Sequence, residues 1–238
     1  MKKAIKIGLA IVVVALLVDD AQQGLKYYLK GPARYFNAII VTGEDADVQA
    51  AKELYKNQSA NVTEYPFKAV NNPIAMLDEN GEQMVRDGEP VFIDDIYLIL
   101  SKSTAKEMLN DQMFRVRKDG NEMNGSIATI PMTQIEGLDG AQNIYLGSPE
   151  LMTSLNVDGT EIALQHAGYA WIGYYPDKSA VVIVDDATYD AIQREEQTIC
   201  RMPFAKGRMD LRNTEDTNAI KNKLSGFPEL DIDYGYID

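Results

Sequence analysis

Short apolar and polar blocks alternate along most of this chain, but the first apolar block differs from the others. Residues 7–18 form an unbroken apolar run, and Lys2, Lys3 and Lys6 precede it. A basic flank, an apolar stretch and a long polar body are typical of a chain whose body crosses a membrane, because Lys and Arg remain on the cytoplasmic side. As a helix the run would rise roughly 18 Å against about 30 Å of hydrocarbon, so it is short for a complete span.

Two roles are open for this run: the core of a signal peptide, or an uncleaved anchor. A cleavable signal needs small residues just past the run, whereas Val18 is followed by two aspartates. The one fitting motif ends at Ala15, inside the run. We therefore favour an uncleaved anchor helix with a stalk over residues 1–30. A buried core segment of a cytosolic protein is the third possibility.

Beyond a helix stop at Gly31-Pro32, the periodicity predicts a strand–turn–helix–strand unit near each end of the remaining chain. The first unit has strands at 34–42 and 62–67 around a helix at 47–56, and the second has strands at 208–211 and 230–234 around a helix at 217–224. Both units place acidic residues at the helix N-terminus, where the helix dipole favours negative charge. This repeated plan predicts that the two units lie side by side in one sheet.

A second repeated step occurs between these units. A strand at 96–100 leads into a helix that starts around Ser101, and a strand at 180–184 leads into a helix that starts around Asp185. Ser and Asp are favoured N-caps, so both steps end a buried strand and begin a helix in the same way. Residues 113–164 contain short apolar stretches broken by Gly-containing turns, which predicts a β-rich insertion.

Together these elements predict an α+β fold with a mixed sheet, short helices, duplicated strand–helix units and a β-rich insertion, preceded by an N-terminal membrane-anchor helix. The expected division is an anchor helix and stalk over residues 1–30 and an extracytoplasmic α+β domain over residues 31–238. Within this domain, residues 31–110 and 178–238 are expected to form a membrane-proximal lobe, with the β-rich insertion at 111–177.

Charge and cysteine content narrow the classes of function. The net charge of −13 and pI near 4.6 argue against nucleic-acid binding, because there is no basic surface to neutralise phosphates. The same acidity argues against a body that lies flat on anionic lipid. Cys200 is the only cysteine, so an internal disulfide is excluded and the domain must rely on its core.

Four segments carry a family resemblance: a strand and cap at 97–101, a turn at 117–122, a Gly-centred hairpin at 156–161 and a second strand–helix step at 181–189. Over roughly residues 5–238 this pattern resembles the extracytoplasmic domain of FtsX-like ABC-transporter permeases of the Gram-positive antimicrobial-peptide type. The resemblance implies a non-catalytic extracellular domain that couples an extracellular substrate or partner to a cytoplasmic ATPase subunit.

This sequence departs from that family in two ways. It has neither the family's further membrane helices nor a nucleotide-binding motif, so the ATPase would have to be reached through membrane helices that are missing here. The alternative is a stand-alone membrane-anchored or secreted protein that binds a ligand or acts as an adaptor. A secreted hydrolase is the third possibility, but the sequence offers no paired nucleophile and base for it. In the first two cases we expect the body of the chain outside the cell membrane.

The candidates for chemistry are few, and we predict no catalytic residue, no metal site and no cofactor. His166 is the only histidine, and Cys200 beside an isoleucine is typical of a small core residue. The acid pairs Asp94-Asp95 and Asp185-Asp186 flank apolar strands, where a cap or a charged strand edge is more common than a carboxylate dyad or a calcium site. Residues 78–82 lack the spacing of a calcium loop and predict a hairpin turn.

The densest aromatic stretch is the remaining candidate for a binding site. Tyr169, Trp171, Tyr174 and Tyr175 could form a ligand platform, because Tyr and Trp offer rigid apolar area with a polar tip. The alternative is a strand with one buried aromatic face. The acidity of the chain favours a cationic peptide or an extracellular protein as the partner, unless it serves only solubility.

Overall fold

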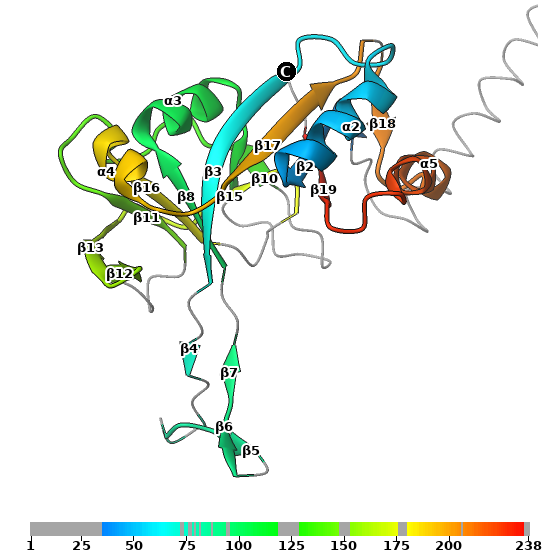
Figure 1. Ribbon diagram of the computed structural model, residues 1–238. Helices are drawn as coiled ribbons and strands as arrows, with labels where there is room; N and C mark the ends of the chain where they lie inside the picture. Colours follow the sequence, from blue (N-terminus) through cyan, green and yellow to red (C-terminus); the bar gives the residue numbers. More distant parts are fainter. Residues whose placement is uncertain are drawn as a thin grey trace, which may run out of the picture.

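The computed structural model describes residues 35–71, 74–75, 78, 80, 82–86, 88–93, 96–118, 129–147, 153–175, 180–205 and 207–235. The anchor expected at residues 1–30 and the acid pair Asp94-Asp95 lie outside the described residues. The fold is α+β, with one large mixed sheet and a few short helices (Figure 1), which confirms the predicted fold class. No helix within the described ranges combines the length and apolar character needed to cross a membrane.

The large sheet has eight strands, and strands from all parts of the described chain meet in it. In spatial order these are β14 (Gln165–His166), β11 (Ile144–Leu146), β16 (Ala180–Val184), β8 (Ile96–Ser101), β3 (Thr63–Asn71), β17 (Glu196–Pro203), β2 (Ala38–Gly43) and β19 (Asp231–Gly235). The β14–β11 and β16–β8 pairs are parallel, and all other neighbours are antiparallel. The central strands β8 and β16 are almost wholly buried, as expected for strands covered on both faces.

The two terminal units lie side by side, as predicted. The first contains β2, α2 (Asp45–Tyr55) and β3, and the second contains β18 (Met209–Asp210), α5 (Thr214–Leu224) and β19. β2 pairs with β19, and β1 (Tyr35–Phe36) pairs with β18. β17 lies between β2 and β3, an arrangement that the repeat does not reveal. Because β17 is antiparallel to both, β2 and β3 run parallel and are joined by α2 as a crossover.

Both strand–helix steps have the predicted caps. β8 leads into α3 (Lys102–Asn110), where Thr104 N donates to Ser101 Oγ at 3.1 Å. β16 leads into α4 (Asp186–Ala191), where Thr188 N donates to Asp185 Oδ1 at 3.0 Å. Hydrogen bonds from the Thr188 hydroxyl and amide hold the pKa of Asp185 below its usual range. Asp185 is therefore a capping residue.

Residues 111–177 contribute to several parts of the fold. β9 (Phe114–Arg117), β10 (Thr129–Pro131) and β15 (Trp171–Ile172) form a separate three-stranded sheet. β12 (Ser154–Val157) and β13 (Thr160–Ala163) form a hairpin, while β11 and β14 join the large sheet. The segment expected as an insertion therefore supplies two strands of the main sheet as well as the smaller sheets.

The large sheet buries side chains on both faces, because successive residues of a strand point to opposite sides. One face, here called the α3 face, carries Ile40 and Leu98 and packs against α3. The opposite face, here called the α2 face, carries Val41 and Cys200 under α2 and α5. Farther along the sheet the α2 face carries Tyr97 under α4 and the β12–β13 hairpin. Both terminal units thus place their helices on the same face.

A narrow arm projects from the body where β3 and β8 leave the large sheet (Figure 1). Its paired strands are β4 (Ile74–Ala75) with β7 (Phe92–Ile93) and β5 (Val85–Arg86) with β6 (Glu89–Pro90). Val85 is 63% exposed on the arm.

Lys68 is a buried cation that ties β3 to the end of α4. Its Nζ donates to the carbonyl oxygens of Tyr189 and Ile192, both at 2.8 Å, and lies 4.5 Å from the centre of the Tyr189 ring. These carbonyls belong to the C-terminal end of the helix, where a positive charge is stabilising.

Lys68→Met should lower the free energy of unfolding by about 2 kcal/mol, because it removes charge-assisted hydrogen bonds and leaves buried carbonyls unsatisfied. Urea unfolding followed by circular dichroism measures the change. Lys56→Met is the matched control, since Lys56 pairs with Glu53 at an exposed position and its replacement should leave the stability nearly unchanged. Equal midpoints for Lys68→Met and the wild type would contradict the structural role of Lys68.

Candidate ligand-binding cleft

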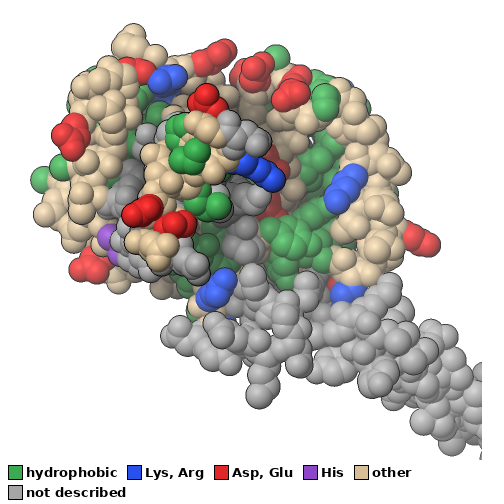
Figure 2. Space-filling view, turned by 90° about the horizontal axis from the view of Figure 1, so that it is seen from below, with side chains coloured by type: hydrophobic (Ala, Val, Ile, Leu, Met, Phe, Trp, Pro, Cys, Tyr) green, Lys and Arg blue, Asp and Glu red, His purple; other side chains and the backbone are tan. Residues whose placement is uncertain are grey.

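A cleft with a volume of about 690 Å³ opens on the α3 face of the large sheet, toward the β19 edge. Its floor consists of alternate residues of five neighbouring strands: Ile40 and Thr42 of β2, Phe67 and Ala69 of β3, Ile96 and Leu98 of β8, Gln197 and Ile199 of β17, and Asp231 and Asp233 of β19. Figure 2, seen from the side on which the arm projects, shows this hollow with hydrophobic and acidic side chains inside it.

The strand register brings the floor residues together. Thr42 is paired with both Ile199 and Asp231, and Ile40 is paired with Asp233. Paired residues of neighbouring strands point to the same face, so these side chains all project into the cleft. A shift of one residue in β19 would replace both aspartates with Ile232 and Tyr234.

The wall opposite the sheet is formed by Ile172 of β15 and by Tyr175, which follows β15. Tyr175 N donates to Asp233 Oδ2 at 3.2 Å, so β19 holds this wall in place. Gly173 lies against the same carboxylate with a φ of +85°, and a Cβ at this position would collide with Asp233. Only glycine fits both the left-handed backbone and this close approach.

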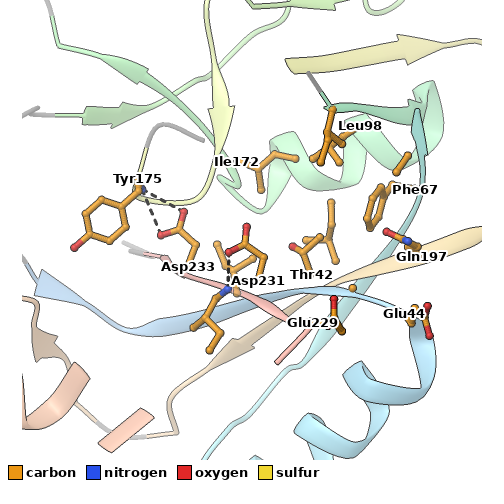
Figure 3. Close-up of a pocket in the computed structure, with 16 residues that line it drawn as sticks. Thr42, Glu44, Phe67, Leu98, Ile172, Tyr175, Gln197, Glu229, Asp231 and Asp233 are labelled. Atoms are coloured by element: carbon orange, nitrogen blue, oxygen red, sulfur yellow. Dashed lines mark hydrogen bonds between the residues drawn. The ribbon is translucent and has the colours of Figure 1, made fainter. Parts of the chain in front are cut away.

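The cleft has an apolar part and an acidic part (Figure 3). Phe67, Leu98 and Ile172 lie together on one side of the close-up, and Glu44, Glu229 and Asp231 lie on the side of β2 and β19. No Lys or Arg occurs among the described residues that line the cleft. The arrangement can hold an apolar group next to a polar or positively charged one.

The four aromatic residues predicted as a ligand platform are only partly brought to this site. Tyr175 lines the cleft and is 46% exposed, with its ring centre 5.1 Å from that of Tyr174. Trp171 is 1% exposed in the core, and Tyr169 lies against it on the outside, with ring centres 5.6 Å apart. Tyr174 packs against the core of the α2 face. A binding role for the four residues stays a prediction, and the geometry favours Tyr175.

Sequence reasoning missed the floor of the cleft. One signal was present, because Asp231 and Asp233 alternate with Ile232 and Tyr234 and so place both acids on one side of a strand. The strands that would lie beside this acidic side could not be inferred from the pattern.

Cys200 and His166 lie far apart. Cys200 is fully buried on β17, and burial raises the pKa of its thiol to about 12. His166 is on β14, with four strands between β14 and β17, and its Nε2 lies 3.0 Å from the Gly147 carbonyl oxygen. Cys200 is thus the small core residue that the sequence predicted. Among the described residues, no cluster of three or more His, Cys, Asp or Glu side chains could hold a metal ion.

Comparison with known proteins gives a family and a fold. A family model described as an uncharacterised lipoprotein family matches residues 36–225. The crystal structure of a Bacillus anthracis protein described as a putative lipoprotein is similar, with a TM-score of 0.59 and 17% sequence identity. The similarity covers 85% of this chain and 99% of that one, and at this identity it supports the fold alone. Comparison with curated proteins gives no match.

The resemblance to FtsX-like ABC-transporter permeases is wrong, because the family match assigns most of the chain to a lipoprotein family. The family match also contradicts the inferred role in transport. It contradicts the inferred partnership with a cytoplasmic ATPase through further membrane helices as well. A buried strand, a Ser or Asp cap and a short helix depend on local hydrogen bonding and occur in many α+β folds, so these segments did not identify a family. A lipoprotein family agrees with the expectation of a protein held at a membrane.

Alkaline pH should destabilise the fold in a defined window. Burial raises the pKa of Cys200, Tyr55 and Tyr234 to about 12 in the folded state. The unfolded chain releases these protons from about pH 8.5 for Cys and about pH 10 for Tyr. Between these values and about pH 12 the folded state holds more protons, so stability falls as pH rises.

Urea midpoints measured from pH 7 to 10 test this in the wild type and in Cys200→Ala. The wild type should lose stability above about pH 8.5, and the variant should lose less over this interval because only the tyrosines remain. The native thiol should also resist a thiol reagent that labels the unfolded chain. Parallel profiles for the two proteins would show that Cys200 is not the titrating group.

Proposed function

Because this chain belongs to the uncharacterised lipoprotein family, we propose that it is a stand-alone, membrane-anchored protein that binds a ligand outside the cell in the cleft on the α3 face. In this proposal the protein binds its ligand without covalent chemistry. The observation that supports it is the cleft itself, in which an apolar floor is combined with a few polar groups from several strands.

The size and lining of the cleft support a binding role. Ligand sites are typically concave, largely apolar and about 300–1,000 Å³ in volume, with a small number of polar groups that orient the ligand. The cleft of about 690 Å³ falls within this range. Its floor lies on a sheet whose opposite face is packed under helices, so the lining side chains are held on a rigid support.

The apolar run at residues 7–18 is the proposed anchor. Cys200, the only cysteine in the sequence, is fully buried in β17, so its thiol is not accessible to a lipid in the folded protein. Attachment through the apolar run behind three lysines would leave the body of the chain on the outer side of the membrane.

Removal of residues 2–20 should move the protein from the membrane fraction to the soluble fraction, whereas Cys200→Ala should leave it in the membrane fraction. Fractionation followed by immunoblotting measures both. Mass spectrometry of the membrane-bound protein should find the N-terminus intact. A mature N-terminus between Ala15 and Gly24 would contradict the uncleaved anchor.

Filling the cleft should abolish ligand binding. Thr42→Trp places an indole on the cleft floor, and Thr160→Trp makes the same exchange at an exposed position of the β12–β13 hairpin. A mixture of small fragments, screened by saturation-transfer NMR, should contain molecules that bind the wild type and Thr160→Trp but not Thr42→Trp. Circular dichroism checks that both variants are folded. If the same fragments bind all three proteins equally, the cleft is not the binding site.

A further inference from the structure

We propose that the ligand of the cleft is a small amphipathic organic cation, with an ammonium or guanidinium group attached to an apolar body. This inference rests on the proposed function, because it concerns the same cleft. It is drawn from how the apolar and acidic side chains are distributed along the floor.

The apolar body would lie over the central strands. Phe67 and Leu98 come from β3 and β8, and they are almost completely buried at 1% and 9% exposure. Ile172 faces them from the wall (Figure 3). A flat hydrocarbon or aromatic group placed here would remove its own apolar surface from water, at about 25 cal/mol per Å².

Three carboxylates line the other part of the cleft, and they come from two segments of the chain. Glu44 precedes α2, Glu229 follows α5, and Asp231 begins β19. Gly43 packs closely against the segment before β19, because a Cβ at this position would lie 2.8 Å from Leu230 Cδ2. The backbone after Gly43 therefore lies directly against the segment that carries Glu229 and Asp231.

The charge of this part selects the ligand. Since none of the described lining residues is Lys or Arg, a bound anion would meet the carboxylates with no positive charge to offset them. A neutral ligand would cover the carboxylates without replacing the water that solvates them. A cation compensates for this loss with charge-assisted hydrogen bonds. The net charge of −13 adds a long-range attraction for cations. The volume of about 690 Å³ fits a small molecule.

Three probes of similar shape and different charge test the inference: benzylammonium, benzyl alcohol and benzoate. The full chain is labelled at Ile and Leu methyl groups and studied by NMR. If its N-terminal segment requires a membrane, the protein is placed in lipid nanodiscs, and empty nanodiscs serve as the blank. Benzylammonium should shift the methyl signals of Ile40, Leu98 and Ile172 and leave that of Ile162, on the far hairpin, in place. It should bind about ten-fold more tightly than benzyl alcohol, and benzoate should bind least.

A charge-matched pair of variants separates the local carboxylates from the net charge. Glu44→Gln with Glu229→Gln should weaken benzylammonium binding about five-fold and leave benzyl alcohol binding unchanged. Asp190→Asn with Glu215→Gln removes the same charge from exposed positions on α4 and α5, and it should weaken benzylammonium binding much less. Added salt should reduce the preference for the cation.

The outcomes distinguish this inference from the proposed function. Equal binding of benzylammonium and benzyl alcohol at the cleft methyls overturns the charge preference and leaves the cleft as a binding site. Equal losses in both double variants also overturn it, because the attraction would then come from the net charge. Absence of cleft shifts with all three probes overturns it as well, and the fragment screen with Thr42→Trp then decides the binding role separately.

Discussion

The pairing of β2 with β17 on one side and β19 on the other is the contact on which the rest of the structure depends. β2 comes early in the chain, and both of its partners come from the C-terminal third. Side-chain alternation on these three strands sends Val41 and Cys200 into the core of the α2 face and Ile40, Thr42 and Ile199 to the α3 face. One register therefore determines both the core under α2 and α5 and the floor of the cleft.

The cleft is a consequence of how the helices are distributed. α2 and α5 both pack on the same side of β2 and β19, so they cover one face of these strands and leave the opposite face uncovered by helices of these units. On the α3 face, α3 and the β9–β10–β15 sheet pack mainly over the central strands. The hollow lies where that cover ends, next to the acidic side of β19. Because both terminal units cover the same face, the opposite face of the sheet is left open near the β19 edge, where the cleft lies.

Features set by neighbouring residues were predictable from the sequence, and features set by distant pairing were not. The caps at Ser101 and Asp185 follow from the strand–helix step and were found correctly, as were the α+β class and the proximity of the terminal units. The place of β17 between β2 and β3 depends on pairing across most of the chain, and no local pattern encodes it. The cleft floor combines residues from five strands in the same way. The family resemblance was wrong for a related reason, because it rested on local strand–helix steps that are common to many folds.

The position of β19 also has a consequence for the biogenesis of the protein. β19 is the last described strand, and it supplies Asp231 and Asp233 to the cleft and holds Tyr175 in the opposite wall. During synthesis, β2 emerges long before β17 and β19, so its edges stay unpaired until the C-terminal segment is available. If the chain is translocated as it is made, the cleft is completed only after nearly all of the domain has crossed the membrane. Compounds on the inner side of the membrane would then never meet an assembled site, and binding would be confined to the outer compartment by the order of folding.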